Sequence, residues 1–366
     1  MKNILGLLNL QERTNSIREL TRERPVGMLP FAGRYRLLDF ALSSMVNSGI
    51  KDVGVLLPEK SRAALDHIRS GKDWDLARHH GGLIYLPPAK QDTHRDGDLK
   101  SMYFDLDYIE HIHADYVLIA DGNYVYNMDF NPAVEYHEEK QADITLVYMT
   151  TPGNGKNGIT LKLDEESRVL ELAEKHTVKR DRSLFLGVAV MSRRLFIDLV
   201  RHGYERGDSD FLLDGVMRQV RSLRIYGFAH TGYAREVNST ESYYATSIDM
   251  FQPEVFWEIF RRGDSVYTKE KDMPPTHFLK QARIKNSLIA NGCEIAGEVE
   301  NSIVFRGVKI KAGAKVRNSI IMQSGVIEEN AVLENIICDK NVVVRQDKWL
   351  RGAEEYPMII GKNIVI

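Results

Sequence analysis

Residues 31 to 50, FAGRYRLLDFALSSMVNSGI, indicate how the first two thirds of this 366-residue chain fold. The stretch predicts a helix that starts near Leu37 and ends at Gly49, because glycine readily adopts the left-handed conformation that terminates helices. Apolar runs lie on either side of this helix, and we expect strands at residues 3–8 and 52–57.

The alternation of apolar runs with amphipathic segments continues to about residue 261. It predicts further strands at residues 116–120, 143–149 and 184–191, and a hairpin over residues 158–171. Asn131 is expected to cap a helix whose first residue is Pro132. Residues 1–261 are therefore predicted to form an α/β, Rossmann-like domain with a mostly parallel sheet.

The pattern changes after residue 261. Residues 262–285 contain Met273-Pro274-Pro275 and are predicted to be a linker. Beyond it, Asn286, Asn301, Asn318 and Asn335 each precede an aliphatic pair, at spacings of 15, 17 and 17 residues. This period predicts a left-handed parallel β-helix over residues 286–366. A β-sandwich with coincidental repeats is the alternative.

Composition narrows the class of protein. Lys plus Arg number 49 and Asp plus Glu number 51, so no broad basic face argues for nucleic acid or anionic lipid. No stretch approaches the roughly 18 apolar residues that cross a bilayer. The two cysteines, Cys293 and Cys338, are too few for a disulfide framework, so a reducing cytoplasm is expected.

A family resemblance rests on residues 31–50. They match the pattern Gly-Gly-Arg-(Tyr/Phe)-Arg-Ile-Ile-Asp-Phe-x-Leu-Ser-Asn-x-x-Asn-Ser-Gly-Ile, and the chain resembles the bacterial glucose-1-phosphate adenylyltransferases. The resemblance implies a nucleotidyltransferase-like domain followed by the β-helix. Hexapeptide β-helices of related transferases sometimes carry acetyltransferase activity with a catalytic histidine, but the sequence has no histidine after His277.

The phosphate-binding loop of that family has no counterpart here. Its glycines let triphosphate oxygens approach bare backbone N–H groups. In this sequence Gln11, Glu12 and Thr14 stand at the three glycine positions, and Ser16 replaces an arginine. Glu12 also adds a negative charge, so ATP is expected to bind weakly or not at all.

The metal positions are altered as well. By resemblance, the aspartate that holds the metal corresponds to Asn123, and a second carboxylate corresponds to Glu236. In an extended strand Asp121 would lie about 6 to 7 Å from Asn123, too far to replace it. Glu236 could equally be a solvated loop residue. We therefore expect no metal or other cofactor on this chain, with Mg²⁺ supplied through a catalytic subunit.

At other positions of the family's substrate pockets, some of the family residues are replaced in this sequence and some are retained. Only the glycine of a nucleotide-pocket motif survives in Gly97-Asp98-Leu99-Lys100-Ser101, and the lysine-proline pair after the phosphate loop falls on Val26-Gly27. On the sugar-phosphate side, Lys175, Gly187 and Asp210 match family residues. They imply a retained sugar-phosphate pocket, although packing of the sheet would explain the same residues.

Arg34 and Arg36 lie where relatives have basic residues near a site for phosphorylated effectors. They could also be surface or subunit contacts. The resemblance is closest to a catalytically degenerate subunit that regulates an active adenylyltransferase, with a hetero-tetramer as the expected assembly. The open alternatives are an autonomous nucleotidyltransferase with rearranged metal ligation and a stand-alone sugar-phosphate sensor.

Overall fold

The computed structural model describes residues 3–11, 17–79, 81–89, 97–151, 158–175 and 182–366. The chain forms two compact units, each built from separate stretches of sequence. Unit 1 contains residues 1–13, 38–236 and 263–267, and unit 2 contains residues 14–37, 237–262 and 268–366. The predicted domain boundaries remain a prediction, because these units are assembled from several segments.

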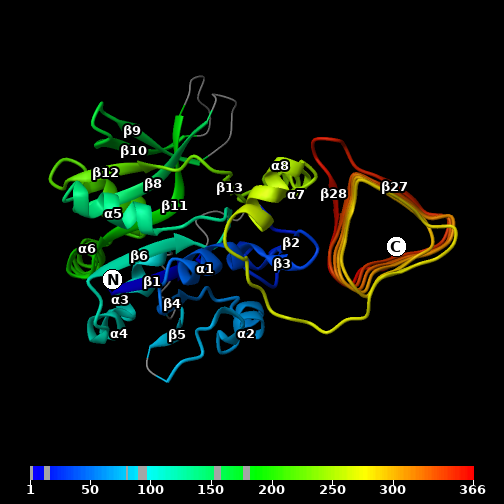
Figure 1. The fold of residues 1–366 in the computed structure, drawn as a ribbon, viewed down its shortest axis with the longest axis horizontal. Coiled ribbons are helices and arrows are strands. Elements are labelled where there is room, and N and C mark those ends of the chain that lie inside the picture. Colours follow the sequence, from blue (N-terminus) through cyan, green and yellow to red (C-terminus); the bar gives the residue numbers. More distant parts are fainter. Residues whose placement is uncertain (1–2, 12–16, 80, 90–96, 152–157, 176–181) are drawn as a thin grey trace. The chain divides into compact units, whose positions relative to one another are not determined.

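Unit 1 is an α/β unit around a nine-stranded, mostly parallel sheet (Figure 1). Its main path runs β10-β9-β11-β6-β1-β4-β5, and β8 joins β11 to β12. The strands are β1 (Ile4–Asn9), β4 (Asp52–Leu56), β5 (Gly82–Leu86), β6 (Tyr116–Asp121), β8 (Ile144–Thr151), β9 (Gly158–Leu163), β10 (Val169–Lys175), β11 (Arg182–Ser192) and β12 (Ile225–Ala229).

Helices connect these strands: α1 (Leu37–Asn47), α2 (Arg62–Ile68), α3 (Asp98–Phe104), α4 (Leu106–His111), α5 (Asn131–Glu139) and α6 (Arg193–Arg206). Three short helices also occur: the 3₁₀ helices η2 (Lys72–Trp74) and η4 (Met217–Gln219), and the π-helix η3 (Phe211–Val216). The expected cap of α5 was wrong by one residue, because Asn131 is already helical and Asp129 accepts its N–H at 2.9 Å.

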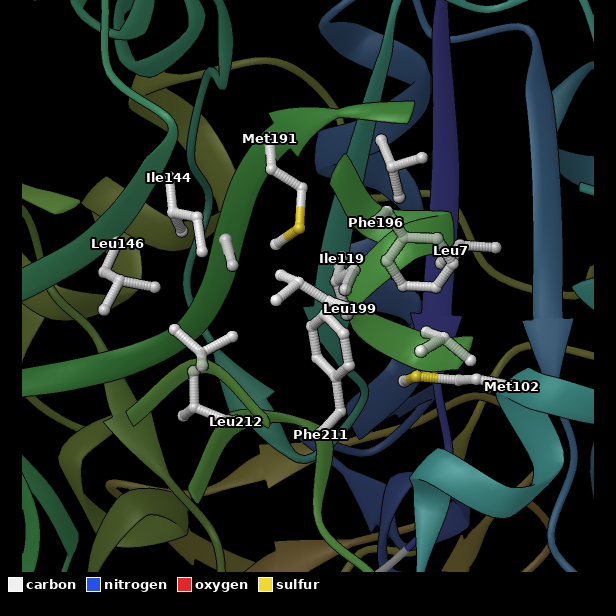
Figure 2. Close-up of a cluster of buried hydrophobic side chains, with 14 of the residues drawn as sticks. Leu7, Met102, Ile119, Ile144, Leu146, Met191, Phe196, Leu199, Phe211 and Leu212 are labelled. Atoms are coloured by element: carbon white, nitrogen blue, oxygen red, sulfur yellow. The ribbon is translucent and has the colours of Figure 1, made fainter. Parts of the chain in front are cut away.

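The core of unit 1 packs the sheet against its helices. Leu7 of β1 and Ile119 of β6 are at most 6% exposed and pack in one cluster with Met102, Met191 and Phe196 (Figure 2). These side chains come from the sheet and from helices α3 and α6. Burying each one contributes roughly 1.5 to 3 kcal/mol.

Unit 2 contains the parallel β-helix, whose coils stack as a triangle (Figure 1). Each side is a five-stranded parallel sheet. Sheet E contains β14 (His277–Phe278), β17 (Glu294–Ile295), β20 (Lys309–Ile310), β23 (Val326–Ile327) and β26 (Val343–Val344). Sheet F contains β15 (Arg283–Lys285), β18 (Glu298–Glu300), β21 (Lys315–Arg317), β24 (Val332–Glu334) and β27 (Trp349–Arg351). Sheet G contains β16 (Leu288–Ile289), β19 (Ile303–Val304), β22 (Ile320–Ile321), β25 (Ile336–Cys338) and β28 (Met358–Ile360).

The repeated asparagines explain the sharp corners between sheets F and G. Asn286, Asn301, Asn318 and Asn335 all have positive φ, between 43° and 55°. Asparagine tolerates this left-handed conformation better than most residues. The Asn286 amide donates to Asn301 Oδ1 at 2.8 Å, so neighbouring coils are also joined through these side chains.

The remainder of unit 2 packs on this β-helix. It comprises η1 (Val26–Met28), the hairpin β2 (Pro30–Phe31) and β3 (Tyr35–Arg36), α7 (Thr240–Asp249), α8 (Pro253–Trp257) and the π-helix η5 (Glu258–Arg262). The Tyr244 hydroxyl donates to the Asn318 carbonyl at 2.7 Å, which joins α7 to a corner of the β-helix. The Tyr243 hydroxyl donates to the Pro30 carbonyl at 2.6 Å and holds the hairpin against the same helix.

Candidate functional site

The candidate site of unit 1 lies where the order of its strands reverses. From β1 the chain moves to β4 and β5 on one side, and it then returns to β6 on the other. Ligands of open α/β sheets bind at the carboxyl ends of the strands beside such a switch point. Asn9 ends β1, Asp121 ends β6, and the two residues are partners in the register of the sheet.

A buried polar network occupies this point. The Asn9 amide donates to Asp98 Oδ2 at 3.1 Å and to Asp121 Oδ1 at 3.2 Å. Asn9 and Asp98 are only 3% and 6% exposed. Two carboxylates therefore converge on one amide at the place where a ligand of this fold would bind.

The start of the first loop is tied to the sheet. Gln11 stands at one of the lost glycine positions, and its N–H donates to Asn9 Oδ1 at 3.0 Å. Its side-chain amide donates to the Leu57 carbonyl, just after β4, at 3.1 Å. The side chain thus uses space at the strand ends that a glycine would leave open. The predictions for Glu12, Thr14 and Ser16 fall outside the described residues.

The degenerate nucleotide-pocket motif forms the start of α3. Gly97 has a φ of 155°, and a Cβ there would lie 2.1 Å from the Ser209 carbonyl oxygen. Close packing against Ser209 therefore explains why this position is a glycine. The next residue, Asp98, accepts the Phe211 N–H at 2.9 Å through Oδ1. Sequence reasoning recorded the loss of the motif but missed that Asp98 is a buried acid at the switch point. The aspartate at position 98 was the sequence feature that could have indicated this role.

The two metal positions lie close together in the fold. A turn at Gly122 and Asn123 separates β6 from β7 (Tyr124–Val125). Strand β13 (Arg235–Glu236) pairs antiparallel with β7, and Glu236 is the partner of Tyr124. Strand β6 ends at Asp121, and Asn123 lies in the turn that follows, so the extended strand assumed for their separation stops at Asp121. That Asp121 does not replace Asn123 stays a prediction.

The donor set here does not suit a divalent cation. Mg²⁺ is usually bound by one or two carboxylates plus substrate phosphates. Asn123 offers an uncharged amide, and the nearby Asp121 carboxylate already accepts from Asn9. Among the described ranges no group of three or more His, Cys, Asp or Glu side chains could hold a metal. The residues present do not fit the metal site that the resemblance implies.

The retained sugar-side positions have clear packing roles. Gly187 has a φ of 71° in an irregular part of β11, and a Cβ there would lie 2.6 Å from the Tyr124 ring and 3.0 Å from Asp121. Asp210 caps η3, since its carboxylate accepts the Leu213 N–H at 2.7 Å. Packing therefore accounts for Gly187 and Asp210, while Gly187 still borders the candidate site.

Lys175 is placed by its backbone alone. It ends β10 and is the register partner of Gly158, which begins β9. A Cβ on Gly158 would lie 3.5 Å from Glu236 Oε2. Residues 158, 175 and 236 therefore come together at one end of the sheet. The structure describes no side-chain contacts for Lys175.

The two predicted effector residues, both in unit 2, differ in environment. Arg34 is exposed, and its guanidinium lies 5.4 Å from the centre of the Tyr35 ring. Arg36 is half-buried and donates to the Met28 carbonyl at 3.3 Å. Burial and the positive charge of Arg36 lower the pKa of Lys340 to about 7, so Arg36 and Lys340 are electrostatic neighbours.

Two further residues, which sequence reasoning missed, complete this group. Arg24 donates to Asp339 Oδ2 at 2.5 Å, and both side chains are buried. Asp339 and Lys340 come from one corner of the β-helix, whereas Arg24 and Arg36 come from the segment after β1. We call Arg24, Arg36, Asp339 and Lys340 the basic cluster. The two halves of this cluster are about 300 residues apart in the sequence, so no local sequence pattern predicts that they meet.

Comparisons with known proteins agree with the fold. Residues 15–221 match the Nucleotidyl transferase family, and residues 274–352 match the GlmU-like, C-terminal hexapeptide family. These matches confirm the predicted α/β nucleotidyltransferase domain and left-handed β-helix. In the part of the chain that the structure describes, no helix is long and apolar enough to cross a membrane.

Proteins that match this chain along most of their length specify its family more closely. The chain is 34% identical to the Glycogen biosynthesis protein GlgD of Bacillus subtilis over 364 residues, which cover 99% of this chain and 96% of that protein. It is 33% identical to the Glucose-1-phosphate adenylyltransferase of Thermosipho melanesiensis, covering 87% and 78%, and 32% identical to that of Desulfitobacterium hafniense, covering 89% and 84%. The chain therefore belongs to the nucleotidyl transferase family, in the group that contains the glucose-1-phosphate adenylyltransferases and GlgD.

Proposed function

We propose that this chain is a regulatory, catalytically degenerate subunit that associates with a catalytic glucose-1-phosphate adenylyltransferase in glycogen biosynthesis. The observation that carries the proposal is the buried Asn9–Asp98–Asp121 network at the switch point. A phosphate charge about 4 Å from one carboxylate is disfavoured by roughly 4 kcal/mol at an effective dielectric constant of 20. Two carboxylates at the strand ends, where a ligand of this fold would bind, therefore support weak or absent binding of ATP.

The likeness to GlgD supports the same role. That relative is named for glycogen biosynthesis, whereas other relatives carry the name of the adenylyltransferase. A chain that keeps the scaffold but loses the nucleotide site can still alter a partner by binding one of its conformations better than another. The expected assembly is a hetero-tetramer, and Mg²⁺ acts in the catalytic subunit.

The test of this role is an activity titration. ADP-glucose formation from ATP and glucose 1-phosphate is measured for this chain, for a catalytic homologue from the same genome, and for their mixtures. We expect no rate from this chain alone and a changed kcat, KM or effector response in the mixture. Unchanged kinetics at saturating amounts of this chain would refute the regulatory role.

The autonomous nucleotidyltransferase is the second candidate, and Glu236 beside the turn of Asn123 favours it most. Titration calorimetry of the isolated chain with ATP and Mg²⁺ separates the two candidates. Binding in the micromolar range would support an autonomous enzyme, whereas the regulatory role predicts no measurable heat of binding.

The basic cluster is the proposed place for a phosphorylated effector. Arg24 is paired with Asp339, and the positive charges of Arg36 and Lys340 in the same cluster suit an anion. Because the pKa of Lys340 is lowered to about 7, a bound anion is favoured by the protonated amine, and its affinity should fall as pH rises through 7.

Titration of inorganic phosphate at pH 6 and pH 8 tests this assignment. We expect weaker binding at pH 8 for the native chain and a smaller pH dependence for Lys340→Met. Arg62→Met is the matched control, because Arg62 is an exposed arginine of α2 and lies outside the basic cluster. Equal phosphate affinities for the native chain and Lys340→Met would show that the basic cluster does not bind the effector. Phosphate itself changes its protonation state near pH 7. The Lys340→Met variant measures how that change alone affects binding.

A further inference from the structure

Lys340, which belongs to the basic cluster, is a lysine whose amine has no bonded partner. It lies two residues after β25 and is half-buried. Its backbone N–H donates to Asp339 Oδ1 at 2.7 Å, but its side chain makes no hydrogen bond or ion pair with the residues that the structure describes. The protonated form of such an amine is disfavoured, because it loses part of its hydration and gains no bonded carboxylate.

The adjacent acid is already bonded to other donors. Asp339 Oδ2 accepts from Arg24 Nη2 at 2.5 Å, and both side chains are buried. The other oxygen, Oδ1, accepts the backbone N–H of Lys340. Both carboxylate oxygens of Asp339 therefore have a donor, and neither is bonded to the Lys340 amine.

The charges around the Lys340 amine are mostly positive. Burial is the largest cause that lowers its pKa, and the cations Arg36, Arg24 and Lys271 lower it further. The negative charge of Asp339 acts in the opposite direction, and the resulting pKa is about 7. At neutral pH the neutral and protonated amines are therefore present in similar amounts. An ordinary lysine, with a pKa of about 10.4, has roughly one neutral amine in 2,500 at that pH.

The same cations suit one class of acylating reagent. A neutral amine is a nucleophile, and guanidinium groups bind phosphate oxygens through paired donors. Arg36 is the cation with the largest effect on Lys340, and it is only half-buried. An acyl phosphate carries its phosphate group directly on an electrophilic carbonyl carbon. A phosphate that binds Arg36 therefore brings this carbonyl beside the neutral amine, and such proximity accelerates a reaction.

We propose that Lys340 is a modification site, acylated without an enzyme by small acyl phosphates. The lone pair of Nζ attacks the carbonyl carbon and forms a C–N bond, and the bond between that carbon and the phosphate oxygen breaks. Phosphate leaves with the electron pair of the broken bond, and the nitrogen gives one proton to water. The product is an uncharged amide, so the basic cluster loses one positive charge. Docking of the phosphate group rests on the anion binding proposed above for this cluster.

The experiment incubates the full chain with acetyl phosphate from pH 6 to pH 9 and measures the acetylation rate of each lysine by peptide mass spectrometry. At pH 7 we expect Lys340 to react at least tenfold faster than two reference lysines. Lys348 is exposed, and Lys362 is paired with Glu23, the other acid near Lys340. The rate at Lys340 should rise to about pH 8 and then level off, because nearly all of its amine is then neutral. The rate at Lys348 should continue to rise.

Two arginine variants show whether the cluster causes this reactivity. Arg36→Met should slow acetylation of Lys340 several-fold, because it removes a phosphate-binding guanidinium and increases the share of protonated amine. Arg62→Met, which changes an exposed arginine of α2, is the matched control and should leave the rate unchanged. Thermal unfolding verifies that each variant is folded. A rate at Lys340 no faster than at Lys348, or an equal rate in Arg36→Met and the native chain, would overturn the proposal.

An excess of inorganic phosphate separates this proposal from the effector assignment. Phosphate that binds the basic cluster should slow acetylation of Lys340 and leave that of Lys348 unchanged. Selective acetylation that depends on Arg36 but is not slowed by phosphate supports the modification site and refutes only the effector assignment. Phosphate binding that depends on Lys340, together with unselective acetylation, refutes only the modification site. The regulatory role is tested separately by the activity titration.

Discussion

Individual side chains determine how the polar groups at the switch point of unit 1 are paired. Asn9 holds Asp98 and Asp121 together, and Gln11 bonds to the end of β4. These polar groups are hydrogen-bonded to one another and to the backbone without a substrate. Polar groups that are already paired gain little from a ligand, because their existing hydrogen bonds would have to be broken.

A restored variant tests this residue-scale account. Gln11→Gly, Glu12→Gly, Thr14→Gly, Ser16→Arg and Asn123→Asp return the family residues, and a second variant carries Asp98→Thr in addition. We expect calorimetric binding of ATP and Mg²⁺ to be stronger when Asp98 is also replaced, because its buried charge opposes phosphate. If both folded variants bind no nucleotide, the assignment of the pocket is wrong.

Asp105, between α3 and α4, gives a second prediction at this scale. Burial raises its pKa to about 6, and its Oδ2 has no hydrogen-bond partner among the described residues. A carboxyl whose folded pKa is raised favours folding when protonated, so its contribution to stability is lost as pH rises from about 4 through 6. Asp105→Asn should therefore raise the free energy of unfolding by about 1 kcal/mol at pH 7 and have little effect at pH 4. Urea unfolding at both pH values measures this, and an equal effect at both would contradict it.

At the scale of elements, a buried ion pair fastens the segment after β1 to the β-helix. Arg24 Nη2 lies 2.5 Å from Asp339 Oδ2, and Arg24 Nε also donates to the Leu20 carbonyl at 2.8 Å. Glu23 and Lys362 form a more exposed pair beside it. Unit 2 is thus held together by contacts between residues more than 300 positions apart.

Breaking the buried pair should destabilise unit 2 strongly. Arg24→Met leaves the Asp339 carboxylate buried without its partner, which typically costs about 3 to 5 kcal/mol. Lys362→Met, which breaks the exposed pair, should cost less than about 1 kcal/mol. Chemical unfolding followed by circular dichroism compares the two variants. A similar small loss for both would show that the buried pair contributes no more than a surface pair.

The sequence predicted local elements well and their long-range contacts poorly. The repeat of Asn286, Asn301 and Asn318 was sufficient for the β-helix, because each coil repeats one local pattern. The glycine losses predict an altered loop, and most of that loop lies outside the described residues. In contrast, Arg24 and Asp339 meet only after the chain has folded, so neither residue shows its partner in the sequence. Asp98 was missed because a buried acid at the start of a helix looks like an ordinary first-turn residue.

At the scale of the whole molecule, the chain combines a hydrogen-bonded polar network at the switch point of unit 1 with a basic cluster in unit 2. Unit 1 retains the nucleotidyltransferase fold, and at its switch point the Asn9 amide donates to the carboxylates of Asp98 and Asp121. Unit 2 carries the basic cluster, where we propose that a phosphorylated effector binds. The central claim is that the chain acts through a partner and does not itself transfer an adenylyl group.

The most direct test is a single rate measurement on the purified chain. ADP-glucose formation is followed with saturating ATP, glucose 1-phosphate and Mg²⁺, in the absence of any catalytic homologue. The account predicts a rate indistinguishable from that of the buffer. Sustained turnover at about 1 s⁻¹ or more, within the ordinary range for enzymes, would contradict it.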